Sequence, residues 1–182
     1  MSKELIQKAR KLAQEIVAPI TESVDKEGRF PKEAYDALKK QGFMGLLVPK
    51  EFGGLGFSII EHTGVCYELA RKDATTGLCY MMHNTGTSGI VSFGSAAMKD
   101  EFLPKIAKGE RAIALAYSES GSGTHFGSPD ISESLENGVR VLNGRKSFVT
   151  SALQADFYMT NTNSCKIKGA HNTWLVDRTL PN

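Results

Sequence analysis

Hydrophobic residues recur every three to four positions over roughly the first 110 residues, which is the spacing of amphipathic helices. The first such stripe has charged residues opposite it and comprises Leu5, Ala9, Leu12, Ala13, Ile16 and Ile20. Pro19 is expected to mark the end of this helix, because proline disrupts a helix interior. A second helix is predicted between Pro31, which suits the first helical position, and Gly42, which suits the position after a helix end.

Serine residues mark the predicted starts of two later helices. Ser58 is followed three positions later by Glu61, and this pair forms the sequence signature of a capping box. Ser95 is the expected cap of a final helix that ends at Gly109. The stretch 75–93 has no charged residue but contains several glycines, so we predict a helix that is buried on all sides.

The pattern changes at Arg111, where a short apolar run predicts a buried strand. Asn137-Gly138 and Asn143-Gly144 are dipeptides typical of tight hairpins, because both residues tolerate a positive φ. The segments between and beside them are predicted to form an antiparallel meander of SESL, VRVL and KSFVT. Two further strands are predicted at DFYMTNT and NTWLV.

The sequence therefore predicts an α+β fold of two domains. An all-helical domain is expected over residues 1–110, and an incomplete antiparallel β-domain over residues 111–182.

Composition excludes several classes of function. The net charge of +2 over 182 residues is too small to indicate nucleic-acid binding, and no apolar run is long enough for a membrane span. The three cysteines form no C-x-x-C pair, which is typical of a reducing compartment and favours a cytoplasmic protein. The four histidines lack metal-ligand spacing, so no metal site is expected.

A glycine-containing loop, SESGSGTH, follows the first predicted strand at residues 118–125. It lacks the lysine of a phosphate-binding P-loop, and no helix follows it as a dinucleotide fingerprint requires. On its own, the loop is more typical of a flexible connection than of a binding site.

Five motifs in a fixed order change this interpretation. They are PKEFGGLG at residues 49–56, LPKIAKGE at 103–110, SESGSGTH at 118–125, LNGRKSFVT at 142–150 and AD at 155–156. In order and spacing they resemble the motifs of the acyl-CoA dehydrogenase family, and the resemblance covers nearly the whole chain.

The resemblance implies an FAD-dependent enzyme of fatty acid metabolism that desaturates an acyl-CoA thioester between its α and β carbons. The implied cofactor-binding residues are Leu115, Tyr117, Ser118, Phe148, Val149 and Thr150. Gly123 and Thr124 would bind the thioester end of the substrate. The family also implies an electron acceptor protein as a partner and a homo-oligomeric assembly.

Some residues depart from the family pattern and leave alternatives open. Ser120 stands where the family has proline, Thr124 where it has serine, His125 where it has aspartate, and Phe148 where it has tryptophan. These changes bear on substrate class, so a flavin-dependent monooxygenase of the same fold is an alternative. A non-catalytic truncated product or one half of a split enzyme is another.

The family's C-terminal helical bundle, which usually carries the glutamate base, has no counterpart in the sequence. Glu61 is expected in a helix cap and Glu119 in the cofactor loop, so no catalytic residue is assigned. We therefore interpret the chain as the first half of an enzyme. By itself it is expected to bind FAD weakly or not at all, to oxidise no acyl-CoA, and to self-associate.

Overall fold

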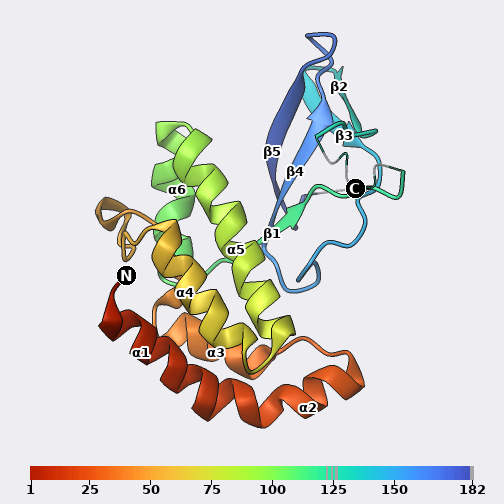
Figure 1. Cartoon of the computed structure of the whole chain (residues 1–182). Helices are drawn as coiled ribbons and strands as arrows, with labels where there is room; N and C mark the ends of the chain where they lie inside the picture. Colours follow the sequence, from red (N-terminus) through yellow and green to blue (C-terminus); the bar gives the residue numbers. More distant parts are fainter. Residues whose placement is uncertain (122, 124, 126, 181–182) are drawn as a thin grey trace. The chain divides into compact units, whose positions relative to one another are not determined.

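The computed structural model describes residues 1–121, 123, 125 and 127–180 of the chain. It divides into two compact units, Met1–Ala112 and Ile113–Asn182. The first unit holds the helices and the second holds the strands (Figure 1). The α+β class predicted from the sequence is confirmed.

The first unit contains six α-helices and three short helical turns in its described residues. The α-helices are α1 (Lys3–Leu12), α2 (Ala18–Glu27), α3 (Lys32–Lys40), α4 (Ile59–Ala70), α5 (Ala74–Phe93) and α6 (Ala96–Ala107). The turns are the π-helical η1 (Ala13–Val17) and the 3₁₀-helical η2 (Phe43–Gly45) and η3 (Lys50–Phe52). The apolar stripe of α1 and η1 packs with residues of α3, α4 and α5 to form the core.

The prediction that Pro19 ends the first helix is wrong. Pro19 lies in the first turn of α2, directly after the π-helical turn η1, and helical structure continues to Glu27. Proline is tolerated in a first turn, where its missing N–H has no partner to lose. The helix instead ends at Gly28, whose φ of 61° lies in the left-handed region.

The predicted capping signals are confirmed. Ser58 and Glu61 form a capping box at the start of α4, with the Ser58 N–H donating to the Glu61 carboxylate at 3.2 Å. The Ser95 hydroxyl accepts from the Met98 N–H at 3.3 Å at the start of α6. Capping side chains accept hydrogen bonds from backbone N–H groups that have no partner inside the helix.

Helix α5 is not buried on all sides, which corrects the prediction from its uncharged sequence. One face packs against α4 and η2, and there the Tyr80 hydroxyl donates to the Phe43 carbonyl at 2.9 Å. The other face is open, since Leu78, Met81 and Phe93 are 46%, 38% and 91% exposed. An uncharged sequence therefore does not by itself show that both faces of a helix are covered.

The second unit contains one five-stranded sheet. Its strands are β1 (Ile113–Ala116), β2 (Ser132–Glu136), β3 (Val139–Asn143), β4 (Phe157–Asn163) and β5 (His171–Asp177). Strand β4 pairs with β1 and β2 in parallel and with β5 in antiparallel orientation, while β2 and β3 form an antiparallel hairpin.

The predicted antiparallel sheet is therefore a mixed sheet. The connection from β1 to β4 spans residues 117–156, which is long enough for the chain to return and enter β4 in the same direction as β1. Alternation along single strands carries no information about this direction, so the sequence pattern missed it.

Of the two predicted Asn-Gly hairpins, the structure confirms one. Asn137 and Gly138 have φ values of 50° and 82° and connect β2 to β3. Asn143 instead ends β3, and residues 144–150 form no strand, so the predicted third strand of the meander is wrong. A Cβ on Gly144 would lie 2.4 Å from Ile131 Cγ1, so this glycine permits a close approach rather than a hairpin turn.

Two kinds of feature are not found among the described residues. None of the helices there has both the length and the apolar character needed to cross a membrane. No group of three or more His, Cys, Asp or Glu side chains in the same residues is arranged to hold a metal ion.

Candidate functional site

Two segments of the second unit that are distant in sequence lie side by side. One follows β1 at residues 117–119 and the other follows β3 at residues 144–151. The Ser147 N–H donates to the Ser118 carbonyl at 2.8 Å and joins them. Thr150 is predicted in the third strand of the meander, and this is wrong, because residues 144–151 form no strand. The structure nevertheless brings the segments of Ser118 and Thr150 together.

The residues assigned to the cofactor from sequence all lie on or beside these segments. Leu115 is in β1, Tyr117 and Ser118 follow that strand, and all three are partly buried. Val149 and Thr150 are also partly buried, whereas Phe148 is 93% exposed. The Phe148 ring is therefore a large apolar surface that nothing in the described structure covers.

The backbone around Phe148 is strained. Phe148 has a φ of 53° and Ser151 a φ of 63°, and each lies in the left-handed region that residues with a Cβ rarely adopt. The left-handed conformation costs roughly 1–2 kcal/mol per residue. Such strain persists only where surrounding contacts impose it, and it is concentrated at binding sites.

The Ser151 hydroxyl gives a second sign of a missing partner. Its oxygen is buried and has no hydrogen-bond partner among the described residues. A buried hydroxyl without a partner costs about 1–3 kcal/mol.

A cavity of about 300 Å³ lies between the sheet and the 144–152 segment. Aliphatic side chains, among them Leu142, Val149 and Val176, form much of its lining. Thr160 adds a polar edge, although its hydroxyl already donates to the Ala116 carbonyl at 2.8 Å. The cavity therefore offers a largely apolar wall next to the strained segment.

A buried ion pair joins the two segments. Lys146 Nζ is 2.5 Å from Glu119 Oε1, and the two side chains are only 9% and 4% exposed. Burial by itself raises the pKa of the Glu119 carboxyl, but hydrogen bonds from Lys146 and from the backbone of Asp130 and Ile131 outweigh it. The pKa of Glu119 is consequently lowered, and the carboxylate stays ionised.

The glycine loop is described only in part. Gly123 is exposed with a φ of 50°, and a side chain there would meet nothing within 4 Å. Thr124, predicted to bind substrate together with Gly123, lies outside the described residues. Ser120 and His125, two of the departures from the family pattern, are both exposed.

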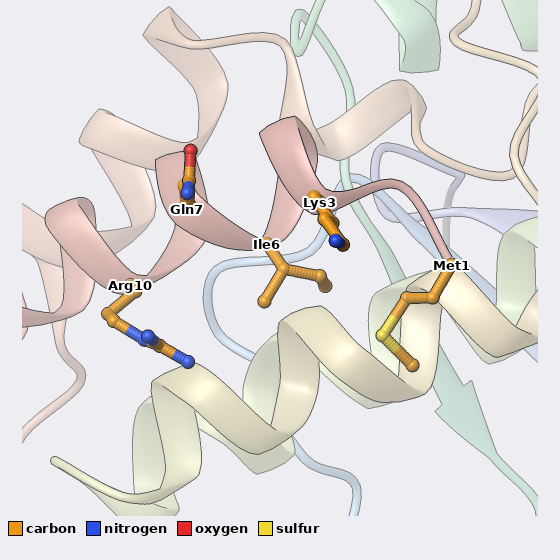
Figure 2. Close-up of a pocket in the computed structure, with 5 residues that line it drawn as sticks. All are labelled: Met1, Lys3, Ile6, Gln7 and Arg10. Atoms are coloured by element: carbon orange, nitrogen blue, oxygen red, sulfur yellow. The ribbon is translucent and has the colours of Figure 1, made fainter.

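A separate groove of about 360 Å³ lies on the first unit and is lined by Met1, Lys3, Ile6, Gln7 and Arg10. Figure 2 shows Met1 and Ile6 pointing toward α4, where Gly64 leaves room for them. The Arg10 guanidinium forms two hydrogen bonds with the buried Glu68 carboxylate, at 3.2 and 2.8 Å. The Arg10 guanidinium thus joins α1 to α4.

Comparison with known proteins identifies the family to which the first unit belongs. Residues 2–110 match the family described as "Acyl-CoA dehydrogenase, N-terminal domain". The chain belongs to the acyl-CoA dehydrogenase family.

Relatives in this family match almost the whole chain. An acyl-CoA dehydrogenase of Bacillus subtilis is 31% identical over 94% of the chain and 46% of its own length. A 3-(aryl)acrylate reductase of Clostridium sporogenes is 32% identical over 96% of the chain and 47% of its own length. The chain thus spans about half the length of these curated relatives.

The acyl-CoA dehydrogenase fold extends through both units. The solved structure of an acyl-CoA dehydrogenase complexed with FAD from Bacillus anthracis has a TM-score of 0.88 and 23% identity. The matched region covers 97% of this chain and 30% of the solved chain. The mixed sheet and the helical unit are therefore both part of the family's fold.

Sequence reasoning missed the Lys146–Glu119 pair and the strain at Phe148 and Ser151. Both charged residues stand in the motifs quoted above, SESGSGTH and LNGRKSFVT. The available signal was the opposite charge of Glu119 in one motif and of Arg145-Lys146 in the other. Their separation of 27 positions hid the fact that they meet.

Proposed function

We propose that the chain is the N-terminal half of an FAD-dependent acyl-CoA dehydrogenase that desaturates an acyl-CoA thioester between its α and β carbons. Support comes from the family of the first unit, from the relative named acyl-CoA dehydrogenase, and from the similar fold that was solved with FAD.

The observation that carries this proposal is the exposed Phe148 ring on its strained backbone. A flavin ring system is flat and amphipathic, so it suits a site with an apolar ring on one side and polar groups at the edge. Phe148 is 93% exposed at a φ of 53°, and the hydroxyls of Ser118 and Thr150 stand on the two adjoining segments. The residues present therefore fit such a group.

Each of the residues predicted from sequence has a role in the proposed site. Phe148 would pack on the flat face of the flavin, while Ser118 and Thr150 would donate hydrogen bonds to its edge. Tyr117 contributes backbone groups, and Leu115 and Val149 exclude water from that side. A flavin held there would supply the acceptor for the hydride that leaves the β carbon of the substrate.

Gly123 and Thr124 are proposed to hold the thioester end of the substrate. Gly123 suits this role because no side chain blocks approach to its backbone, and its φ of 50° is readily adopted by glycine. Orientation of the thioester places the α and β carbons for reaction, and this is a positional contribution to rate.

The base that removes the α-proton is proposed to lie outside this chain. Glu119 is buried in an ion pair with Lys146, and Glu61 caps α4. Both carboxylates already have structural partners. An effective general base needs a carboxylate oxygen free to reach the proton that it removes, so we assign this role to neither of them.

The remaining parts of the proposal concern the whole protein. We propose an electron acceptor protein as its redox partner and a homo-oligomeric assembly. Exposed apolar side chains on α4, at Ile59, Ile60 and Tyr67, support an interface on that helix. The reducing, cytoplasmic setting expected from the sequence, whose three cysteines form no C-x-x-C spacing, is part of the same proposal.

The test uses the full-length natural protein, purified with its flavin. We expect a flavin absorbance spectrum that bleaches when an acyl-CoA is added without oxygen. Replacing Ser118 by Ala together with Thr150 by Val should lower flavin retention, since each lost hydrogen bond costs about 1 kcal/mol. Flavin that stays oxidised with every acyl-CoA offered would reject the dehydrogenase assignment, and an unchanged flavin content in the double variant would reject the assigned hydroxyls.

A further inference from the structure

Lys146 connects three separate parts of the second unit. Its ammonium group donates to the Tyr117 carbonyl at 3.2 Å, to Glu119 Oε1 at 2.5 Å and to Asn161 Oδ1 at 2.8 Å. An ammonium has three N–H donors, so all of them are used. The Lys146 side chain is only 9% exposed, so these hydrogen bonds lie in the interior of the unit and not on its surface.

Glu119 extends the same network to a fourth part of the chain. Its carboxylate also accepts from the Asp130 N–H at 2.6 Å and from the Ile131 N–H at 3.4 Å, just before β2. The network therefore joins the segment after β1, the start of β2, the segment after β3, and β4. These are the elements that surround the proposed cofactor residues.

The network lies immediately before the strained residues. Lys146 is followed by Ser147, whose N–H donates to the Ser118 carbonyl at 2.8 Å, and then by Phe148 with its φ of 53°. A strained conformation needs contacts on its flanks that impose it. Lys146 and Ser147 supply such contacts on the N-terminal side.

We infer that Lys146 is a positioning residue for the cofactor, which holds the 147–151 segment against residues 117–119 so that Phe148 and Thr150 face the flavin. This inference rests on the proposed function. Lys146 does not touch the reacting atoms in this scheme, because its three donors are occupied by protein acceptors.

The variants separate positioning from simple stability. Lys146→Met alone leaves the buried Glu119 charge without its cationic partner and destabilises the unit. The double variant Lys146→Met with Glu119→Gln removes that charge as well and should recover the unfolding temperature. Lys168→Met is the matched control, because Lys168 is an exposed lysine in the β4–β5 connection of the same unit.

Two measurements are made on the full-length protein after flavin removal: the affinity for added FAD, and hydrogen exchange of the 147–151 amides without FAD. In the double variant we expect FAD binding to be about tenfold to a hundredfold weaker. Losses of this size are found when residues that hold metal ligands in place are replaced. We also expect faster exchange at residues 147–151. The control variant should match the wild type in both.

The outcomes distinguish the inference from the function it rests on. A double variant with wild-type unfolding temperature, FAD affinity and exchange would overturn the inference and leave the proposed function standing. A wild-type protein that binds no FAD would overturn the proposed function itself. If the double variant fails to fold, Lys146→Arg replaces it, because arginine keeps the charge but its planar group cannot reproduce the three bonds. Wild-type FAD affinity in that variant would also overturn the inference.

Discussion

Gly54 lies in the PKEFGGLG motif, and its replacement by alanine tests why the family motif requires glycine there. A Cβ on Gly54 would lie 2.1 Å from the Val48 carbonyl oxygen and 2.4 Å from Val48 Cβ. An ordinary carbon–oxygen contact is roughly 3.3 Å. The Val48 carbonyl cannot easily move away, because it accepts the Gly56 N–H at 2.9 Å and Val48 is fully buried.

The neighbouring Gly53 provides a matched control with a different cost. Its φ is 82°, but a Cβ there would meet nothing within 4 Å. Gly53→Ala should therefore cost only the left-handed strain of about 1–2 kcal/mol. Gly54→Ala should cost about 3 kcal/mol or more, because overpacking against backbone displaces the connector. The loss of unfolded-state entropy on going from glycine to alanine is common to both variants and cancels in the comparison.

Urea unfolding followed by the helical circular dichroism signal measures both variants against the wild type. We expect the Gly54→Ala midpoint to fall clearly below that of Gly53→Ala, with unchanged slopes. If the two variants lost equal stability, close approach to Val48 would not be the reason for glycine at position 54. The motif would then need an explanation from the whole enzyme, such as contact with a bound ligand.

Two further predictions concern titration and thiol reactivity. Hydrogen bonds from Asn172, from the Cys165 backbone and from Arg140 hold the pKa of the buried Glu133 carboxyl at about 2. The stabilising contribution of this carboxylate is therefore complete above the usual glutamate pKa and is lost as the pH falls through about 2. Glu133→Gln should therefore flatten the dependence of the unfolding temperature on pH between 5 and 2. An unchanged dependence would show that the carboxylate interactions contribute little to stability. Burial raises the pKa of the Cys66 thiol to about 12, so at pH 8 a thiol reagent should modify the exposed Cys165 and leave Cys66 unmodified in the folded chain. Mass spectrometry of the peptides checks this, and labelling of Cys66 at the rate of Cys165 would mean that the helical core opens.

Local signals in the sequence predicted the local features well. The Ser58–Glu61 capping box and the Asn137-Gly138 hairpin depend on residues at most three positions apart, and both formed as predicted. Asn143-Gly144 has the same dipeptide but no hairpin, because the following segment bonds to Ser118 instead of continuing the meander. The sequence pattern also did not predict the parallel pairing of β1 with β4, because that pairing depends on residues more than 40 positions apart.

The candidate site shows the same division between local and distant information. The motifs located the two segments by resemblance, but only the structure shows the Lys146–Glu119 pair that holds them together. A buried ion pair is poor evidence for stability alone, because desolvation of both charges offsets much of their attraction. Here the ammonium also meets the Tyr117 carbonyl and Asn161, so its position is defined from three directions. Apolar residues would fill the same space without that directional constraint. The flat cofactor that we propose at Phe148 would depend on this constraint more than on added stability.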